Sequence, residues 1–262
     1  MNQEIRFFMR NLIKSRRLFW AALLGLFPVV MTLILILVKP LLEDRDVEVF
    51  RLYPQISFFL YLHFLLPMTA VFTGSAVIGE EVEDQTLPYL LIRPIPKWRF
   101  AVSKILANLL VLGCILILSL FLCYTVLHLP YGLSGWLDES GQLARSIGVL
   151  LLGLAAYLPL FSFLGALFKK AVLGGLLFTF GWENLIAYLP GNAKLLTIVH
   201  YLHSLYPTFF RSNTGGILGM LPIKITMTKD IVAIFVLLMI SIAGFSLTAL
   251  VLTVREYRLE RE

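Results

Sequence analysis

The sequence VIGEEVEDQTLPYLLIRPIPKWR, which runs from Val77 to Arg99, is the most polar segment in the middle of a very apolar chain. Carboxylates open it, leucines follow, and prolines and basic side chains close it. Long hydrophobic runs flank it on both sides. Because charged side chains are costly inside a bilayer, a charged and amphipathic segment between two such runs indicates a docking surface at the membrane face.

The composition around this segment is typical of a membrane protein. Of the 262 residues, 59% are hydrophobic and only 15% are charged, whereas about a quarter is charged in soluble domains. Six apolar runs approach or exceed the roughly 20 residues that a helix needs to cross a bilayer. The sequence therefore predicts an all-α membrane protein, one transmembrane domain over residues 1–262, with six transmembrane helices at residues 18–38, 56–78, 100–127, 147–168, 171–189 and 231–254.

Three segments outside these runs have their own character. Residues 1–17 place Ile5, Phe8 and Leu12 at helical spacing opposite basic side chains, which predicts an amphipathic helix lying in the membrane interface. An ordinary polar lead-in to the first span is the alternative. Residues 79–99 form a coupling region. Residues 192–229 combine a short amphipathic pattern with several Gly and Pro residues, which predicts a broken outer segment, re-entrant or interfacial, before the last span.

The Lys and Arg distribution predicts the orientation. The net charge of +6 follows the loops, so we interpret it as topology and expect no nucleic-acid partner. Six spans place both termini, the central stretch and Lys169-Lys170 on one side, which then carries fourteen of the 22 basic residues. We expect a multi-pass protein of the cytoplasmic (inner) membrane with both termini and the central stretch inside the cell, where a soluble partner can reach it.

Several motifs of catalytic or metal-binding proteins are missing from the sequence. It contains no G-x-x-x-x-G-K-[ST] loop, no His-Glu-x-x-His and no Cys-x-x-Cys, so we expect no cofactor on this chain and no enzymatic activity. His200 and His203 are three residues apart and could share a metal ion. Two ligands make only half a site, however, and we expect no metal.

Glu183 is a carboxylate well inside an apolar run, between Trp182 and Asn184. Carboxylates inside the membrane usually have a function or are paired within a bundle. Trp182, Glu183 and Asn184 are therefore candidates for a polar point in a translocation path or at a subunit interface. The alternative, which the sequence leaves open, is a structural carboxylate that accepts hydrogen bonds from a neighbouring helix.

The central stretch has the properties of a mechanical link. A short rigid helix outside the bilayer, connected to two spans, can transmit a push from a soluble motor, whereas the alternative is a plain solvated loop. The mechanical link is favoured by four features, which are the carboxylates at the end of a span, the amphipathic turn, the stiff prolines and the basic residues at the headgroups. The residues assigned to docking are Glu80, Glu81, Glu83, Asp84, Thr86, Leu87, Leu90, Leu91, Pro94, Lys97 and Arg99.

In combination with this topology, the chain resembles the membrane subunit of bacterial ABC transporters of the ABC-2 permease type. The features that carry the resemblance are the acidic cluster, Thr86, the pair Leu90-Leu91, Pro94, the basic residues and Lys104, with Trp182-Glu183 later in the chain. The interfacial first helix, the six spans and the broken outer segment are also similar to the family. Gln85 departs from it, because the family usually has Gly there.

The resemblance implies a function. Two copies of such a subunit, as a homodimer or a pseudo-dimer, would dock on two copies of a separate ATP-binding subunit through the coupling helix between the second and third spans. ATP and Mg²⁺ would be bound by that partner. Its closure would rock the spans and export a substrate by alternating access, past the second and fifth spans.

Two other classes remain as alternatives. An ion-coupled secondary carrier, or another membrane protein independent of ATP, usually shows internal repeats and several ionisable residues within the membrane, and here Glu183 alone qualifies. An intramembrane enzyme would need a clustered constellation of His, Asp, Ser or metal ligands, which the sequence does not show.

Overall fold

The computed structural model describes residues 2–38, 52–83, 96–168, 170–187, 192–206 and 228–254. Every element assigned within these ranges is helical. The elements are α1 (Asn2–Ile13), α2 (Arg16–Val38), α3 (Tyr53–Ile56), η3 (Ser57–Leu65), α4 (Leu66–Glu83), α6 (Lys97–His128), η4 (Leu129–Tyr131), α7 (Gly132–Asp138), α8 (Ser140–Leu167), α9 (Ala171–Leu176), η5 (Leu177–Glu183), α10 (Asn184–Ala187), η6 (Ala193–Leu196), α11 (Ile198–Ser204) and α13 (Asp230–Val254).

Five helical stretches of the described chain are long and apolar enough to cross a membrane. They are Arg16–Val38, Tyr53–Glu81, Lys97–Tyr131, Gly135–Leu167 and Asp230–Val254. These confirm the first, second, third, fourth and sixth predicted spans. The fifth predicted span coincides with a shorter apolar helix, Ala171–Glu183, and it remains a prediction.

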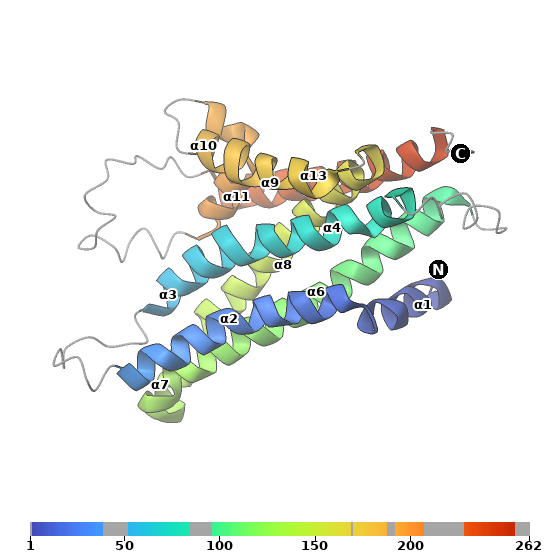
Figure 1. The fold of residues 1–262 in the computed structure, drawn as a ribbon. Coiled ribbons are helices and arrows are strands. Elements are labelled where there is room, and N and C mark those ends of the chain that lie inside the picture. Colours follow the sequence, from blue (N-terminus) through green and yellow to red (C-terminus); the bar gives the residue numbers. More distant parts are fainter. Residues whose placement is uncertain are drawn as a thin grey trace.

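The long helices run side by side as a bundle (Figure 1). One end of the bundle holds α1, the C-terminal end of α4, the N-terminal end of α6 and the C-terminal end of α13. The other end holds α3, α7 and α11. This distribution agrees with the grouping predicted from the sequence, in which residues 1–17 and the flanks of the central stretch share a side.

The second span changes its helical geometry before Pro67. A π-helix covers Ser57–Leu65, and the backbone N–H of Leu66 bonds back to the carbonyl of Tyr61. Pro67 has no N–H to donate to the preceding turn, so this turn forms the wider π-helical hydrogen bond instead of the α-helical one. The hydroxyl of Thr69 donates to the carbonyl of Leu65 at 2.8 Å, which satisfies one carbonyl at this irregularity.

The centre of the bundle is formed by α4, α8 and α13, which approach each other through glycine. A Cβ added at Gly165 of α8 would overlap the carbonyl oxygen of Ser75 in α4, and one added at Gly244 of α13 would lie 2.8 Å from Cβ of Pro159. Small residues of this kind let helix backbones touch inside a membrane protein. The largest fully buried side chains near these contacts include Tyr157 and Phe161.

The outer helices leave most of their apolar side chains exposed. In α2 the exposed residues include Phe19, Leu23 and Phe27, and in α13 they include Phe235 and Leu250. Exposed apolar surface of this extent on long apolar helices is expected where lipid is the solvent. The chain is therefore a multi-pass membrane protein.

Candidate functional site

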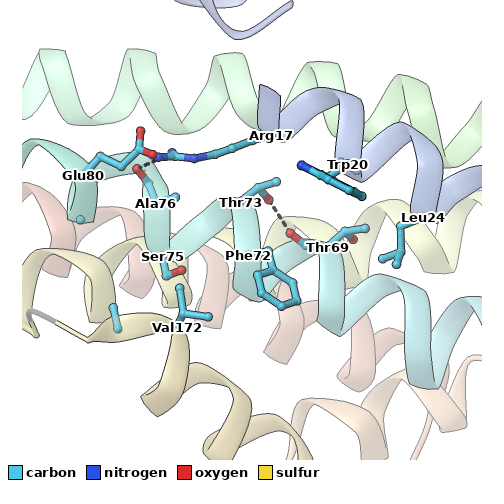
Figure 2. Close-up of a pocket in the computed structure, with 13 residues that line it drawn as sticks. Arg17, Trp20, Leu24, Thr69, Phe72, Thr73, Ser75, Ala76, Glu80 and Val172 are labelled. Atoms are coloured by element: carbon cyan, nitrogen blue, oxygen red, sulfur yellow. Dashed lines mark hydrogen bonds and ion pairs between the residues drawn. The ribbon is translucent and has the colours of Figure 1, made fainter. Parts of the chain in front are cut away.

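The end of the second span is tied to its neighbours by two ion pairs. The carboxylate of Glu80 pairs with the guanidinium of Arg17, the second residue of α2 (Figure 2). The same guanidinium also donates to the carbonyl of Ala76 at 3.4 Å. At the next residue, the carboxylate of Glu81 accepts a hydrogen bond from the ammonium of Lys104 in α6. Adjacent glutamates at the end of α4 thus connect it to α2 and to α6.

The amphipathic helix α1 is fastened to the beginning of α6. Nε of Arg99 lies 3.3 Å from Oε2 of Glu4, and the hydroxyl of Ser103 donates to the same oxygen at 3.1 Å. The rings of Phe8 and Phe100 meet edge to face, with centroids 5.5 Å apart. Glu4 and Phe8 are four residues apart in α1, so helical spacing places both on the face that meets α6. Within residues 1–17 the structure has a helix over Asn2–Ile13, and its place in the membrane interface stays a prediction.

These contacts form a frame around the segment 84–95. Glu83 ends α4, Lys97 begins α6, and α1 lies across the start of α6. We call this set of pairs, Arg17–Glu80, Glu81–Lys104 and Glu4–Arg99, the ion-pair frame. It holds both ends of the segment at fixed positions.

The docking residues predicted from the sequence are placed as follows. The carboxylate of Glu80 is 48% exposed, while that of Glu81 is 17% exposed because it turns inward to Lys104. Lys97 and Arg99 lie in the first turn of α6. The other members of the set lie outside the described residues or have side chains that are not described: Glu83, Asp84, Thr86, Leu87, Leu90, Leu91 and Pro94.

A cavity of about 300 Å³ lies beneath α1, between α4 and α6. Phe8 and Phe100 line one part of it, and Glu81, Lys104 and Asn108 line another. Oε2 of Glu81 is buried and has no hydrogen-bond partner within the described part of the chain. The frame is thus not packed solid, and α1 covers a partly polar space next to the Glu81–Lys104 pair.

Glu183 has a structural environment at the opposite end of the bundle. It is fully buried, and its carboxylate accepts the backbone N–H groups of Ile198 at 3.1 Å and Val199 at 3.0 Å. The hydroxyl of Tyr157 in α8 donates to it at 3.1 Å. Ile198 and Val199 are the first two residues of α11, and their backbone N–H groups have no partner within that helix. Glu183 therefore anchors α11 to the bundle, as in the structural alternative that the sequence left open.

Trp182, one of the two neighbours of Glu183, does not join it. The side chain of Trp182 is 47% exposed, so it lies on the outer surface of η5 while Glu183 points inward. The side chain of Asn184 is outside the described part. Trp182 and Glu183 thus do not form one polar point. The helix that Glu183 anchors is entirely buried, which makes this part of the outer segment an integral piece of the bundle.

A histidine pair that the sequence did not indicate provides a second anchor for α11. Nε2 of His203 lies 2.8 Å from Nε2 of His63 in η3. Nδ1 of His63 lies 3.1 Å from the carbonyl of Phe58; a carbonyl only accepts, so this nitrogen carries the proton. Nε2 of His63 is then the acceptor for His203. Sequence reasoning could have found His63 because it is a polar residue inside a predicted span.

His200 and His203 do not share a metal site. Nε2 of His200 lies 2.9 Å from the hydroxyl of Thr228, whereas His203 is directed to His63. Among the residues that the structure covers, no group of three or more His, Cys, Asp and Glu side chains converges on a point that could hold a metal ion. Burial lowers the pKa of His203 well below its usual value, and the nearby His63 and His200 act in the same direction.

Comparison with known protein families gives a match over much of the chain. The family described as "ABC-2 family transporter protein" matches residues 12–182, a range that contains the ion-pair frame apart from Glu4. A comparison with curated proteins finds no significant match.

Proposed function

The chain belongs to the ABC-2 transporter family, and from this membership we propose that it is the transmembrane subunit of an ATP-driven ABC transporter that exports a substrate. It would carry no ATPase site of its own. A separate ATP-binding subunit, present in two copies, would hold ATP and Mg²⁺. Two copies of the present chain, as a homodimer, would enclose the path of the substrate.

The observation that carries this proposal is the ion-pair frame. A motor outside the membrane needs a surface that is firmly connected to more than one span. Glu80 and Glu81 connect the end of α4 to α2 and α6, and Glu4 connects α1 to α6. Residues 79–99 would therefore act as the coupling region, with contacts to the motor made by the segment 84–95 and by the exposed side chains beside it.

The frame changes the roles proposed for the acidic residues. Exposed Glu80 remains available to a partner at the surface, while Glu81 would act inside the frame by positioning the end of α4. The proposed orientation has α1, the coupling region and both termini on the cytoplasmic side of the inner membrane. The shorter apolar helix Ala171–Glu183, continued by α10, would be the fifth crossing and bring the total to six.

The test is affinity purification of the tagged full chain from its native membrane in mild detergent. We expect a protein with a G-x-x-x-x-G-K-[ST] loop to co-purify, and its ATPase rate to respond to the presence of this chain. The variant Asp84→Lys combined with Leu87→Asp should lose the partner, because it alters the coupling segment and leaves the ion-pair frame intact.

A matched control is Arg10→Gln, which removes an exposed charge of α1 outside the frame. It should retain the partner. Transport by purified chain in vesicles without any ATPase, driven by an ion gradient, would overturn the proposal in favour of a secondary carrier. Retention of the ATPase by the Asp84/Leu87 variant would refute the role of the coupling segment.

A further inference from the structure

A small polar pocket lies at the end of the bundle that holds α3, α7 and α11 (Figure 1). Its volume is about 160 Å³, which is less than the roughly 300 to 1,000 Å³ of sites for drug-sized ligands. It is lined by α3, the start of η3, the first two turns of α8 and the residue two positions after α11, that is, by Tyr53, Pro54, Ser57, Gly141, Gln142, Arg145, Ser146 and Tyr206. None of these lining residues belongs to the ion-pair frame or to the fifth predicted span.

The phenol of Tyr53 forms part of the buried wall of this pocket. Tyr53 is only 1% exposed, and within the described part of the chain its hydroxyl has no hydrogen-bond partner. The ring itself is held in place, because it meets the ring of Tyr124 edge to face with centroids 5.0 Å apart. A buried hydroxyl without a partner is unfavourable. A fixed, unbonded donor on the wall of a pocket therefore points to a ligand that accepts a hydrogen bond.

The other hydroxyls that line the pocket already use their protons. Those of Ser57 and Ser146 each donate to a backbone carbonyl three or four residues earlier, at 3.2 and 2.8 Å. The hydroxyl of Tyr206 contacts the oxygens of both serines, so its single proton is used between them. Of the four hydroxyls in the described lining, that of Tyr53 thus keeps its proton for a ligand.

The electrostatic character of the pocket is positive. Nε of Arg145 donates to the carbonyl of Leu205 at 3.0 Å, and Nη2 lies 3.4 Å from a carboxylate oxygen of Asp230. These bonds use two of the five N–H donors of the guanidinium. Asp230 is not among the lining residues, and its side chain is 58% exposed. Gly141, in the first turn of the long helix α8, adds the positive end of a helix dipole.

We propose that this pocket binds a small carboxylate anion, whose oxygens accept hydrogen bonds from the guanidinium of Arg145 and the phenol of Tyr53. A carboxylate matches the planar fork of a guanidinium in shape, and its single charge matches the one guanidinium of the lining. The bound anion would join α3 to α8. In the orientation given under the proposed function the ligand arrives from outside the cell, whereas binding itself requires neither the ATP-binding subunit nor transport.

The test uses acetate and the purified full chain in detergent. Acetate replaces chloride at constant ionic strength, and the affinity is obtained from the saturable rise in unfolding temperature. Tyr53→Phe should weaken acetate about tenfold or more, because a hydrogen bond to a charged group is lost. It should not lower the unfolding temperature in chloride, since the hydroxyl has no bond to lose. Asp230→Asn should bind acetate about two- to fivefold more tightly, because it removes a carboxylate that competes for Arg145.

Tyr201→Phe is the control for the loss of a tyrosine hydroxyl. The hydroxyl of Tyr201 donates to the carbonyl of Leu195 at 2.8 Å, and Tyr201 does not line the pocket. This variant should lower the unfolding temperature and keep the acetate affinity. Should Tyr53→Phe fail to fold, Arg145→Lys keeps the charge, loses the planar fork and should also weaken acetate.

Two results would overturn the proposal. One is an unaltered chain whose unfolding temperature does not respond to acetate. The other is an acetate affinity that is the same in Tyr53→Phe, or in Arg145→Lys, as in the unaltered chain. Both results would leave the proposed transport function untouched, because the assay contains no ATP-binding subunit and measures no transport.

Discussion

Nε2 of His63 and Nε2 of His203 face each other at 2.8 Å, although 140 positions separate them in the chain. The contact joins the π-helical part of the second span to α11, and Glu183 joins the other end of α11 to η5 and α8. The short helix is therefore held by contacts to three predicted spans, the second, the fourth and the fifth.

The histidine pair predicts a loss of stability in acid. The pKa of His203 lies well below its usual value because of burial, so the folded state favours the neutral ring. A group with a depressed pKa of this kind contributes its full stability above the unfolded pKa, about 6.5 for His, and that stability declines as the pH falls below it. We expect a lower unfolding temperature in detergent at pH 5.5 than at pH 7.5.

His203→Phe should keep the ring packing and remove the titration. At pH 7.5 we expect a loss of about 1 to 3 kcal/mol, because His63 is left without its donor. The difference between the two pH values should shrink relative to the unaltered chain. An unchanged difference would show that the acid sensitivity arises elsewhere.

Glu183→Gln should detach the start of α11. The carboxylate accepts three donors, whereas an amide offers one acceptor oxygen and turns an NH₂ group toward a backbone N–H. We expect a loss of about 2 to 3 kcal/mol and faster hydrogen exchange in residues 198–204. Tyr157→Phe removes one donor and keeps both backbone bonds, so it should cost about 1 kcal/mol. Equal effects of the two variants would contradict the anchor.

Gly165→Ala should be among the most damaging single substitutions in α8. Its methyl group would overlap the carbonyl oxygen of Ser75, so α4 and α8 would have to separate. Overpacking of this kind costs about 1 to 3 kcal/mol or more. Gly148→Ala is the control in the same helix, because a Cβ there meets nothing within 4 Å. The measurement is the unfolding temperature in detergent. Similar values for both variants would argue against the close contact between α4 and α8.

Exchanging the charges of Glu81 and Lys104 distinguishes two possible roles of Glu81, an ion pair within the frame and a direct contact with the ATP-binding subunit. Glu81→Lys alone places two ammonium groups together and should lower transport and stability. The double variant Glu81→Lys with Lys104→Glu restores the pair and should recover most of both. If Glu81 instead contacts the ATP-binding subunit directly, the double variant will bind that subunit as poorly as the single one.

Phe8→Ala should loosen α1 from α6. The ring pair with Phe100 contributes about 0.5 to 1.5 kcal/mol beyond the buried area, and the Glu4–Arg99 pair does not replace this contribution. We expect faster tryptic cleavage at Arg6 and Arg10 in detergent. Phe7→Ala, in which the deleted ring is 54% exposed, should change the cleavage rate less.

The sequence by itself determined the membrane class, five of the spans and the family, because about 20 consecutive apolar residues leave few structures other than a spanning helix. It also indicated the amphipathic α1 through its helical spacing. The Ala171–Glu183 helix, with its π-helical second part, is shorter than a full span in the described chain.

Only the tertiary structure decided which charges face each other. Glu81 stood out from the sequence as part of an acidic cluster and Glu183 as a carboxylate inside an apolar run, yet one is paired with Lys104 and the other binds the backbone of α11. The partner of His63 is set only by the tertiary structure, which places α11 beside η3. Apolar periodicity specifies which segments are helices, whereas helix packing sets the partners of polar groups, and these lie far apart in the chain.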